Sequence, residues 1–105
     1  MASGRDFLDF ILGQLSILPD IDYRAMMGEF IIYYRGKVIG GIYDNRFLVK
    51  NTPSAQRLMP NAPLEIPYKG GKPMIMVEDV ENQDLLVALF NVMYSELPET
   101  KRKKR

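Results

Sequence analysis

The sequence predicts an α+β fold in two layers, with an antiparallel sheet and the element order α-βββ-α-ββ-α. Three apolar runs between residues 30 and 49 are rich in the β-branched and aromatic residues that favour strands. Arg-Gly at 35–36 and Asp-Asn at 44–45 separate these runs, and such pairs suit the tight turns of hairpins. Amphipathic patterns over residues 4–18 and 82–97 predict helices, which would bury their apolar stripes against the sheet.

The first helix is expected over residues 4–18. Ser3 is a suitable N-cap, and a carboxylate at Asp6 favours the positive end of the helix dipole. Pro19 ends the helix, because a proline disfavours the helical conformation of the residue before it. The apolar residues of this segment recur at a spacing that lines one helical face: Phe7, Leu8, Ile11, Leu12 and Leu15.

The strands are expected at residues 30–34, 38–43 and 47–49. Gly28 lies inside an extended run over residues 25–32, where a glycine predicts a bulge or a close backbone approach, and the same holds for glycines 40–41. Side chains alternate along a strand, so both faces of the sheet are fairly apolar. One face should pack on the helices, and the other is either partly exposed or covered by a partner.

The second half of the chain predicts a short helix, two strands and a long helix. Thr52 is a suitable N-cap with proline at the first helical position, and strands are expected at 64–68 and 74–77. The last helix, over residues 82–97, can be capped by Asp79 or Asn82. Its apolar stripe is clean: Leu85, Leu86, Leu89, Val92, Met93 and Leu97.

Length and composition indicate one domain over residues 1–100, followed by a basic tail over residues 101–105. Hydrophobic residues make up 47% of the 105-residue chain and charged residues 26%, values that are ordinary for soluble globular proteins. No apolar run is long enough to span a bilayer, and the start of the chain lacks the pattern of a signal peptide. We therefore expect a cytoplasmic location.

The chain contains neither cysteine nor histidine. These absences exclude disulfides, thiolate nucleophiles, sulfur-ligated zinc and every mechanism that needs a histidine base. An enzyme would have to use carboxylate or lysine chemistry in a pocket that the sequence does not reveal. We expect no catalytic residues, no cofactor and no metal site.

The net charge of +1 hides a separation of charge along the chain. Without the last five residues, 9 basic residues stand against 13 acidic ones, which gives a net charge of about −4. The tail itself is a candidate nucleic-acid site that would act without sequence preference, or it is a solvated end. Its residues are Lys101, Arg102, Lys103, Lys104 and Arg105.

Three other patterns each have two interpretations. The Lys-Gly-Gly-Lys segment at 69–72 resembles part of a phosphate-binding loop, but a strand follows it, which favours a hairpin turn. The acidic residues between 78 and 84 lack the spacing of a calcium loop, which favours a capped helix start. The seven methionines fill gaps in the core or form an adaptable binding surface.

The segments that carry a family resemblance are Met-Met-Gly at 26–28, Tyr-Tyr-Arg-Gly-Lys at 33–37, Gly-Gly-Ile at 40–42, residues 44–50 and Lys-Gly-Gly-Lys-Pro-Met at 69–74. In their order and spacing they resemble the TfoX (Sxy) N-terminal domain family, and the chain is similar to its short, single-domain members. Met27 stands where the family often has phenylalanine. The resemblance implies a two-layer TfoX-N or secretion-chaperone-like fold, no known catalytic residues, and a role in transcription or competence-type regulation.

Together these observations predict a regulatory or adaptor domain that binds a protein partner without catalysing a reaction. The predicted contact residues are Tyr33, Arg35, Tyr43 and Arg46, which should be exposed on the hairpins and supply area and charge-assisted hydrogen bonds. The alternative function is nonspecific nucleic-acid binding through the tail. No membrane partner is expected, and the chain is a monomer or a homodimer.

Overall fold

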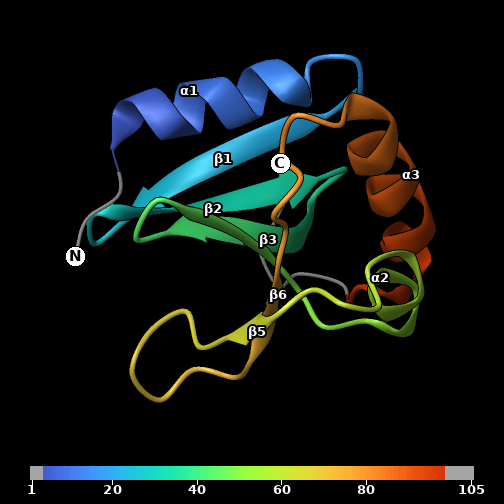
Figure 1. The fold of residues 1–105 in the computed structure, drawn as a ribbon. Coiled ribbons are helices and arrows are strands. Elements are labelled where there is room, and N and C mark those ends of the chain that lie inside the picture. The colour runs from blue at the N-terminus through green and yellow to red at the C-terminus, as the bar shows by residue number, and fades with distance from the viewer. Residues whose placement is uncertain (1–3, 99–105) are drawn as a thin grey trace.

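The computed structural model describes residues 4–98 (Figure 1). The helices are α1 (Arg5–Gln14), α2 (Pro53–Leu58) and α3 (Gln83–Met93), and a short 3₁₀ helix, η1 (Tyr94–Glu96), follows α3. The strands are β1 (Ile21–Met26), β2 (Glu29–Tyr34), β3 (Lys37–Tyr43), β4 (Arg46–Val49), β5 (Leu64–Glu65) and β6 (Met74–Met76). No helix in this part of the chain is long and apolar enough to cross a membrane.

The six strands form one antiparallel sheet in the order β1-β2-β3-β4-β6-β5. Figure 1 shows α1 lying along β1, whereas α3 lies toward the other end of the sheet with α2 beside it. The predicted α+β class with an antiparallel sheet is therefore confirmed.

The sheet has one strand more than the sequence predicted, because the expected run over residues 25–32 is broken by a hairpin turn at 27–28. The turns at 27–28, 35–36 and 44–45 have the same backbone form, with positive φ values between 52° and 86° at both central residues. Two positive φ values define the turn that matches the twist of a two-residue hairpin. Gly28 therefore belongs to a turn, and its prediction as a bulge or a close approach is wrong.

Glycines 40 and 41 do lie where the backbones come close. The register between β2 and β3 shifts between Ile32 and Tyr33. A Cβ atom on Gly40 would lie 2.2 Å from the carbonyl oxygen of Leu48 on β4. The shift lets Ile39 turn its side chain into the core, where it is fully buried.

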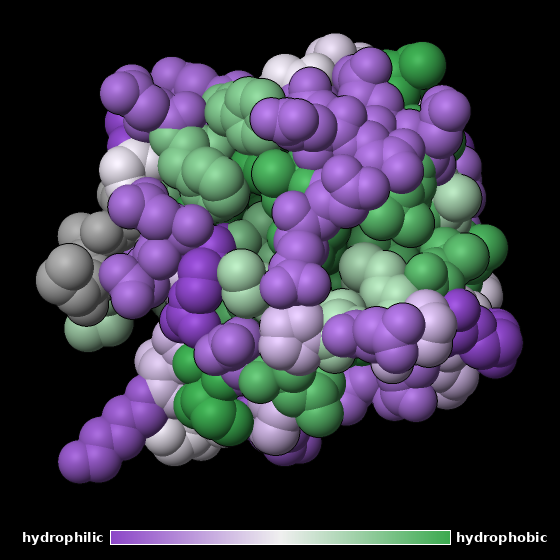
Figure 2. Space-filling model, viewed as in Figure 1, coloured by the Kyte–Doolittle hydropathy of each residue, from purple (hydrophilic) through white to green (hydrophobic). Residues whose placement is uncertain are grey.

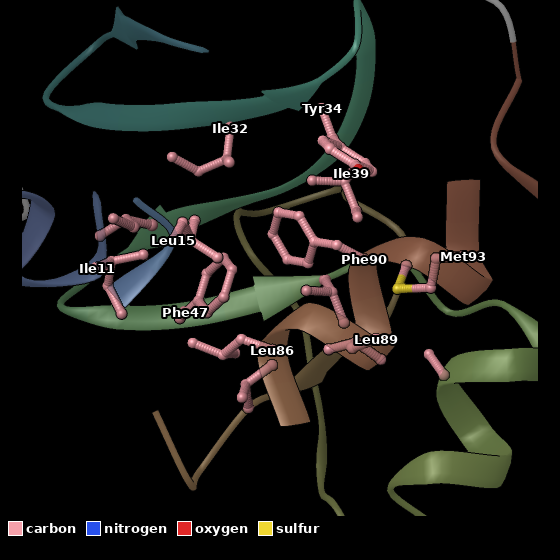
Figure 3. Packing of buried hydrophobic residues seen from close by; sticks show 14 of the residues in the cluster. Ile11, Leu15, Ile32, Tyr34, Ile39, Phe47, Leu86, Leu89, Phe90 and Met93 are labelled. Atoms are coloured by element: carbon pink, nitrogen blue, oxygen red, sulfur yellow. The ribbon is translucent and has the colours of Figure 1, made fainter. Parts of the chain in front are cut away.

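The core lies between the sheet and the helices. Figure 3 shows Phe90 of α3 pointing toward the sheet between Tyr34 and Phe47. Its ring centroid lies 5.6 Å from that of Tyr34 and 6.2 Å from that of Phe47. Leu8 and Ile11 of α1, and Leu15 directly after it, are fully buried in the same cluster. Hydrophilic residues cover much of the surface in Figure 2, with hydrophobic patches between them.

The helix starts follow the predicted chemistry at two of the three helices. The hydroxyl of Thr52 accepts a hydrogen bond from the Ala55 N–H, and the side chain of Asn82 accepts one from the Leu85 N–H. Helix α1 starts after Gly4, whose N–H donates to the side chain of Asn45, whereas the predicted cap Ser3 lies outside the described residues.

Candidate functional site

The helices leave one face of the sheet uncovered, and we call it the helix-free face. Five side chains from the central strands define it: Ile31, Tyr33, Val38, Tyr43 and Leu48. Phe30, Ile32 and Tyr34 alternate with them and point into the core. The alternation of a strand therefore gives this sheet a second apolar surface, as the sequence predicted.

A groove of about 680 Å³ lies on the helix-free face. Its floor is formed by the sheet, one wall by the loop between β5 and β6, and one end by the segment that follows η1. The apolar side chains that line it are Met26, Ile31, Val38, Tyr43, Pro67, Tyr68, Pro73, Met74, Leu97 and Pro98. Segments that are far apart in the sequence thus meet around one hollow of the size that proteins use for ligands.

Two tyrosines form the wall under the β5–β6 loop. The ring centroids of Tyr43 and Tyr68 lie 6.0 Å apart with the rings tilted, a favourable arrangement for an aromatic pair. Tyr68 is 58% exposed, whereas Tyr43 is 7% exposed. Burial raises the pKa of the Tyr43 hydroxyl above its ordinary value, and nearby Tyr68 and Glu29 act in the same direction. The Tyr43 phenol therefore stays protonated at neutral pH and can donate a hydrogen bond.

Three charged residues reach the groove. Lys50 and Lys72 have no acidic partner among residues 4–98. Glu96 is already bonded, because the Ser54 hydroxyl donates to its carboxylate at 2.7 Å and the Ser54 N–H donates at 3.1 Å. These bonds hold the pKa of Glu96 below its ordinary value. The free charge at the groove is therefore positive.

The bonds of Glu96 also position the end of the groove. They join η1 to the first turn of α2, where Thr52 and Ser54 are the two buried polar residues within 4–98. Arg57 donates to the Ser54 hydroxyl at 2.8 Å and completes the cluster. Leu97 follows Glu96 directly and is buried, so the cluster holds the wall that Leu97 contributes.

The four predicted contact residues do not form one surface. Tyr33 and Tyr43 are only 6% and 7% exposed, so the expectation that they are exposed is wrong, although Tyr43 does line the groove. The guanidinium of Arg35 lies over the rings of Tyr34 and Tyr94, with its central carbon 5.6 and 5.8 Å from their centroids.

Arg46 is also used within the domain. Its guanidinium contacts the Glu65 carboxylate at 2.9 Å and donates to the carbonyl of Tyr43. The basic tail, Lys101–Arg105, lies outside the described residues. Within residues 4–98, no group of three or more acidic side chains is placed to hold a metal ion, and residues 69–72 form a loop with positive φ at Gly70.

The sequence predicts Tyr43 as a contact residue, but it does not predict the groove that Tyr43 lines. Strand alternation alone places Ile31 and Val38 on the sheet face opposite the core residues, so part of this apolar surface could be predicted. The positions of Tyr68 and Pro98 are not predictable from local patterns, since they depend on how the β5–β6 loop and the last segment fold back over the sheet.

One known protein resembles the chain along its whole length. It is the "Uncharacterized 12.7 kDa protein in trpE 5'region" of Spirochaeta aurantia, which is 30% identical over 105 residues. The alignment covers 99% of this chain and 91% of the spirochaete protein. No protein-family model matches the chain, and no solved structure matches it. The resemblance to the TfoX N-terminal domain family therefore stays a prediction.

Proposed function

The chain belongs to the family of the Spirochaeta aurantia 12.7 kDa protein, and we propose that it is a non-enzymatic adaptor or regulatory domain. Its groove would bind a short apolar segment of a partner protein. The observation that carries this proposal is the apolar hollow of about 680 Å³ on the helix-free face. A hollow lined by tyrosines and methionines has the composition of protein interfaces, where aromatic residues and methionine are enriched.

The charge at the groove narrows the kind of segment that fits. Lys50 and Lys72 offer positive charge, whereas the carboxylate of Glu96 is turned to Ser54. A segment with apolar residues and one or two acidic residues would fill the hollow and pair with the lysines. Pairs of exposed charges add little affinity, so the apolar contacts supply most of the binding and the lysines contribute orientation.

The nature of the regulation rests on the family resemblance. If the chain is a TfoX-like domain, the partner would be a component of transcription or competence-type control. Nucleic-acid binding through Lys101–Arg105 is the alternative, and it does not use the groove.

The test is selection of peptides from a random display library with the full chain as bait. We expect the selected peptides to share apolar residues flanked by aspartate or glutamate. Two groove variants, Met26→Glu and Tyr68→Glu, should bind a selected peptide at least tenfold more weakly, because each places a carboxylate at an exposed apolar lining position. The matched control is Ile17→Glu, which changes a residue that is 71% exposed and is not part of the groove.

Binding would be measured by fluorescence anisotropy with a labelled peptide, and the fold of each variant by circular dichroism. A library that yields no common peptide would contradict the proposal. So would peptides whose affinity is the same for the Met26→Glu and Tyr68→Glu variants as for the native chain.

A further inference from the structure

Strand β1 forms one edge of the sheet and is open along most of its length. It has six residues, whereas β5 at the opposite edge has two. Asp22, Arg24, Ala25 and Met26 are all exposed. A long edge without proline presents unpaired backbone groups that another strand can bind.

The hydrogen-bond pattern shows which groups of β1 point outward. In a two-residue hairpin the residues that flank the turn bond to each other, so Met26 points its backbone groups toward β2. The Arg35 N–H donates to the carbonyl of Asp20 at 3.0 Å, so Asp20 also points its backbone carbonyl toward the residues that follow β2. Asp20 and Met26 are an even number of residues apart, so the two ends of the strand agree on which residues face β2. Ile21, Tyr23 and Ala25 therefore turn their N–H and C=O groups away from the sheet.

The side chain of Asp22 agrees with this assignment. Its carboxylate accepts a hydrogen bond of 2.8 Å from the N–H of Tyr23, one of the outward groups. Within residues 4–98, the backbone groups of Ile21 and Ala25 that face outward have no backbone partner. The edge is thus capped locally at one position and open at the two others.

We propose that a second copy of this chain pairs with β1, antiparallel and about a twofold axis through Tyr23. In this arrangement the Asp22 carboxylate would release the Tyr23 N–H and turn toward the second copy's Arg24. The outward groups of each Tyr23 would then bond to those of its mate, and Ile21 would bond to the second copy's Ala25. Every pair of residues that exchanges hydrogen bonds in this arrangement consists of two outward-facing residues, as an antiparallel ladder requires. The two six-stranded sheets would become one continuous sheet.

The charges on β1 select this register. With Tyr23 opposite its mate, Asp22 lies directly opposite the second copy's Arg24, and the reverse pair forms on the other side of the axis. A shift of two residues in one direction places Asp22 opposite Asp22, and in the other direction Arg24 opposite Arg24. Opposite charges at facing positions stabilise a strand pair and like charges destabilise it.

The alternative interpretation is that Asp22 and Arg24 prevent the edge from pairing with another strand, because charged residues on an edge strand commonly do so. Their order argues against it, since the two signs are complementary in the register that pairs all three outward-facing residues of β1. The ring of Tyr23 also leaves the axis clear. It packs edge-on against Phe30 of β2, at a centroid distance of 6.1 Å, and the Arg5 side chain covers it.

The test is a charge-swap experiment read out by sedimentation velocity on the full chain at concentrations up to millimolar. The native chain should form a dimer. Asp22→Arg or Arg24→Asp alone should weaken it about tenfold or more, because two attractive pairs become two repulsive ones. Mixing these two variants should restore a dimer, since each supplies the charges that the other lacks. The matched controls are Glu78→Arg and Lys69→Asp, which change the net charge equally at exposed positions away from β1.

A backbone variant provides an independent check. Ala25→Pro removes an outward N–H and should abolish the dimer, and circular dichroism would show whether the variant folds. A native chain that stays monomeric at millimolar concentration would overturn the proposal. A dimer that survives Asp22→Arg, or a mixture of the two charge variants that stays monomeric, would also overturn it.

Discussion

Phe90 packs α3 against the centre of the sheet, and Phe90→Ala should destabilise the domain strongly. The side chain is fully buried and lies between Tyr34 and Phe47, with ring centroids 5.6 and 6.2 Å away. Replacing such a phenylalanine by alanine costs about 3–5 kcal/mol, from the lost burial and from the cavity left behind. Because domains of this size are stable by about 5–15 kcal/mol, the substitution should remove a large share of the total.

The measurement is urea denaturation followed by circular dichroism, with the midpoint and the slope compared to those of the native chain. The control is Val92→Ala on the same helix, where the side chain is 42% exposed and the free energy of unfolding should change by less than about 0.5 kcal/mol. A loss below about 1.5 kcal/mol for Phe90→Ala would refute the assignment of Phe90 to the centre of the core. So would an equal loss in the control.

Three further predictions follow from other parts of the structure. Gly40→Ala should lower the free energy of unfolding by about 1–3 kcal/mol in a urea titration, because its Cβ would meet the backbone of β4. By contrast, Gly13→Ala in α1 should raise the free energy of unfolding by up to about 1 kcal/mol, since nothing lies within 4 Å of the added Cβ. The hydrogen bonds from Ser54 lower the pKa of Glu96, so the stabilisation by Glu96 should be complete above the ordinary carboxyl pKa and lost as the pH falls through the lowered pKa. Glu96→Gln should therefore flatten the dependence of the thermal unfolding temperature on pH in that acidic range. Removing Lys101–Arg105 should abolish salt-sensitive DNA binding in fluorescence anisotropy, and binding that survives the deletion would contradict a tail-based site.

The parts of the fold that follow from local chemistry were predictable. The turns at 35–36 and 44–45 contain glycine, asparagine or aspartate, which accept positive φ, and their positions set the strands on either side. The residues at 27–28 do not predict a turn, because the first is Met27, and methionine rarely adopts a φ of 54°. Because the turn at 27–28 is not predicted, β1 is not separated from β2 in the prediction, and the sheet has one strand more than predicted.

The functional site was less predictable than the fold. Arg35 is exposed as predicted, although its guanidinium lies over two aromatic rings, whereas Arg46 is half-buried and bound to Glu65. A sequence lists potential donors and does not show which of them find partners inside the fold. The groove depends on long-range packing, since its wall at Tyr68 is placed by the β5–β6 loop and its end by the bonds between Glu96 and Ser54.

In the proposed dimer, the grooves of the two copies lie on the same side of the assembly. A twofold axis that relates antiparallel β1 strands is perpendicular to the sheet, so both copies would turn their helix-free faces in the same direction. Met26 lines the groove and ends β1, so each groove begins beside the shared edge. A partner that carries two apolar segments could fill both grooves at once, and its second segment would bind at a high effective concentration. A single groove of modest affinity would then suffice for tight binding, which gives a small domain a physical route to selecting its partner.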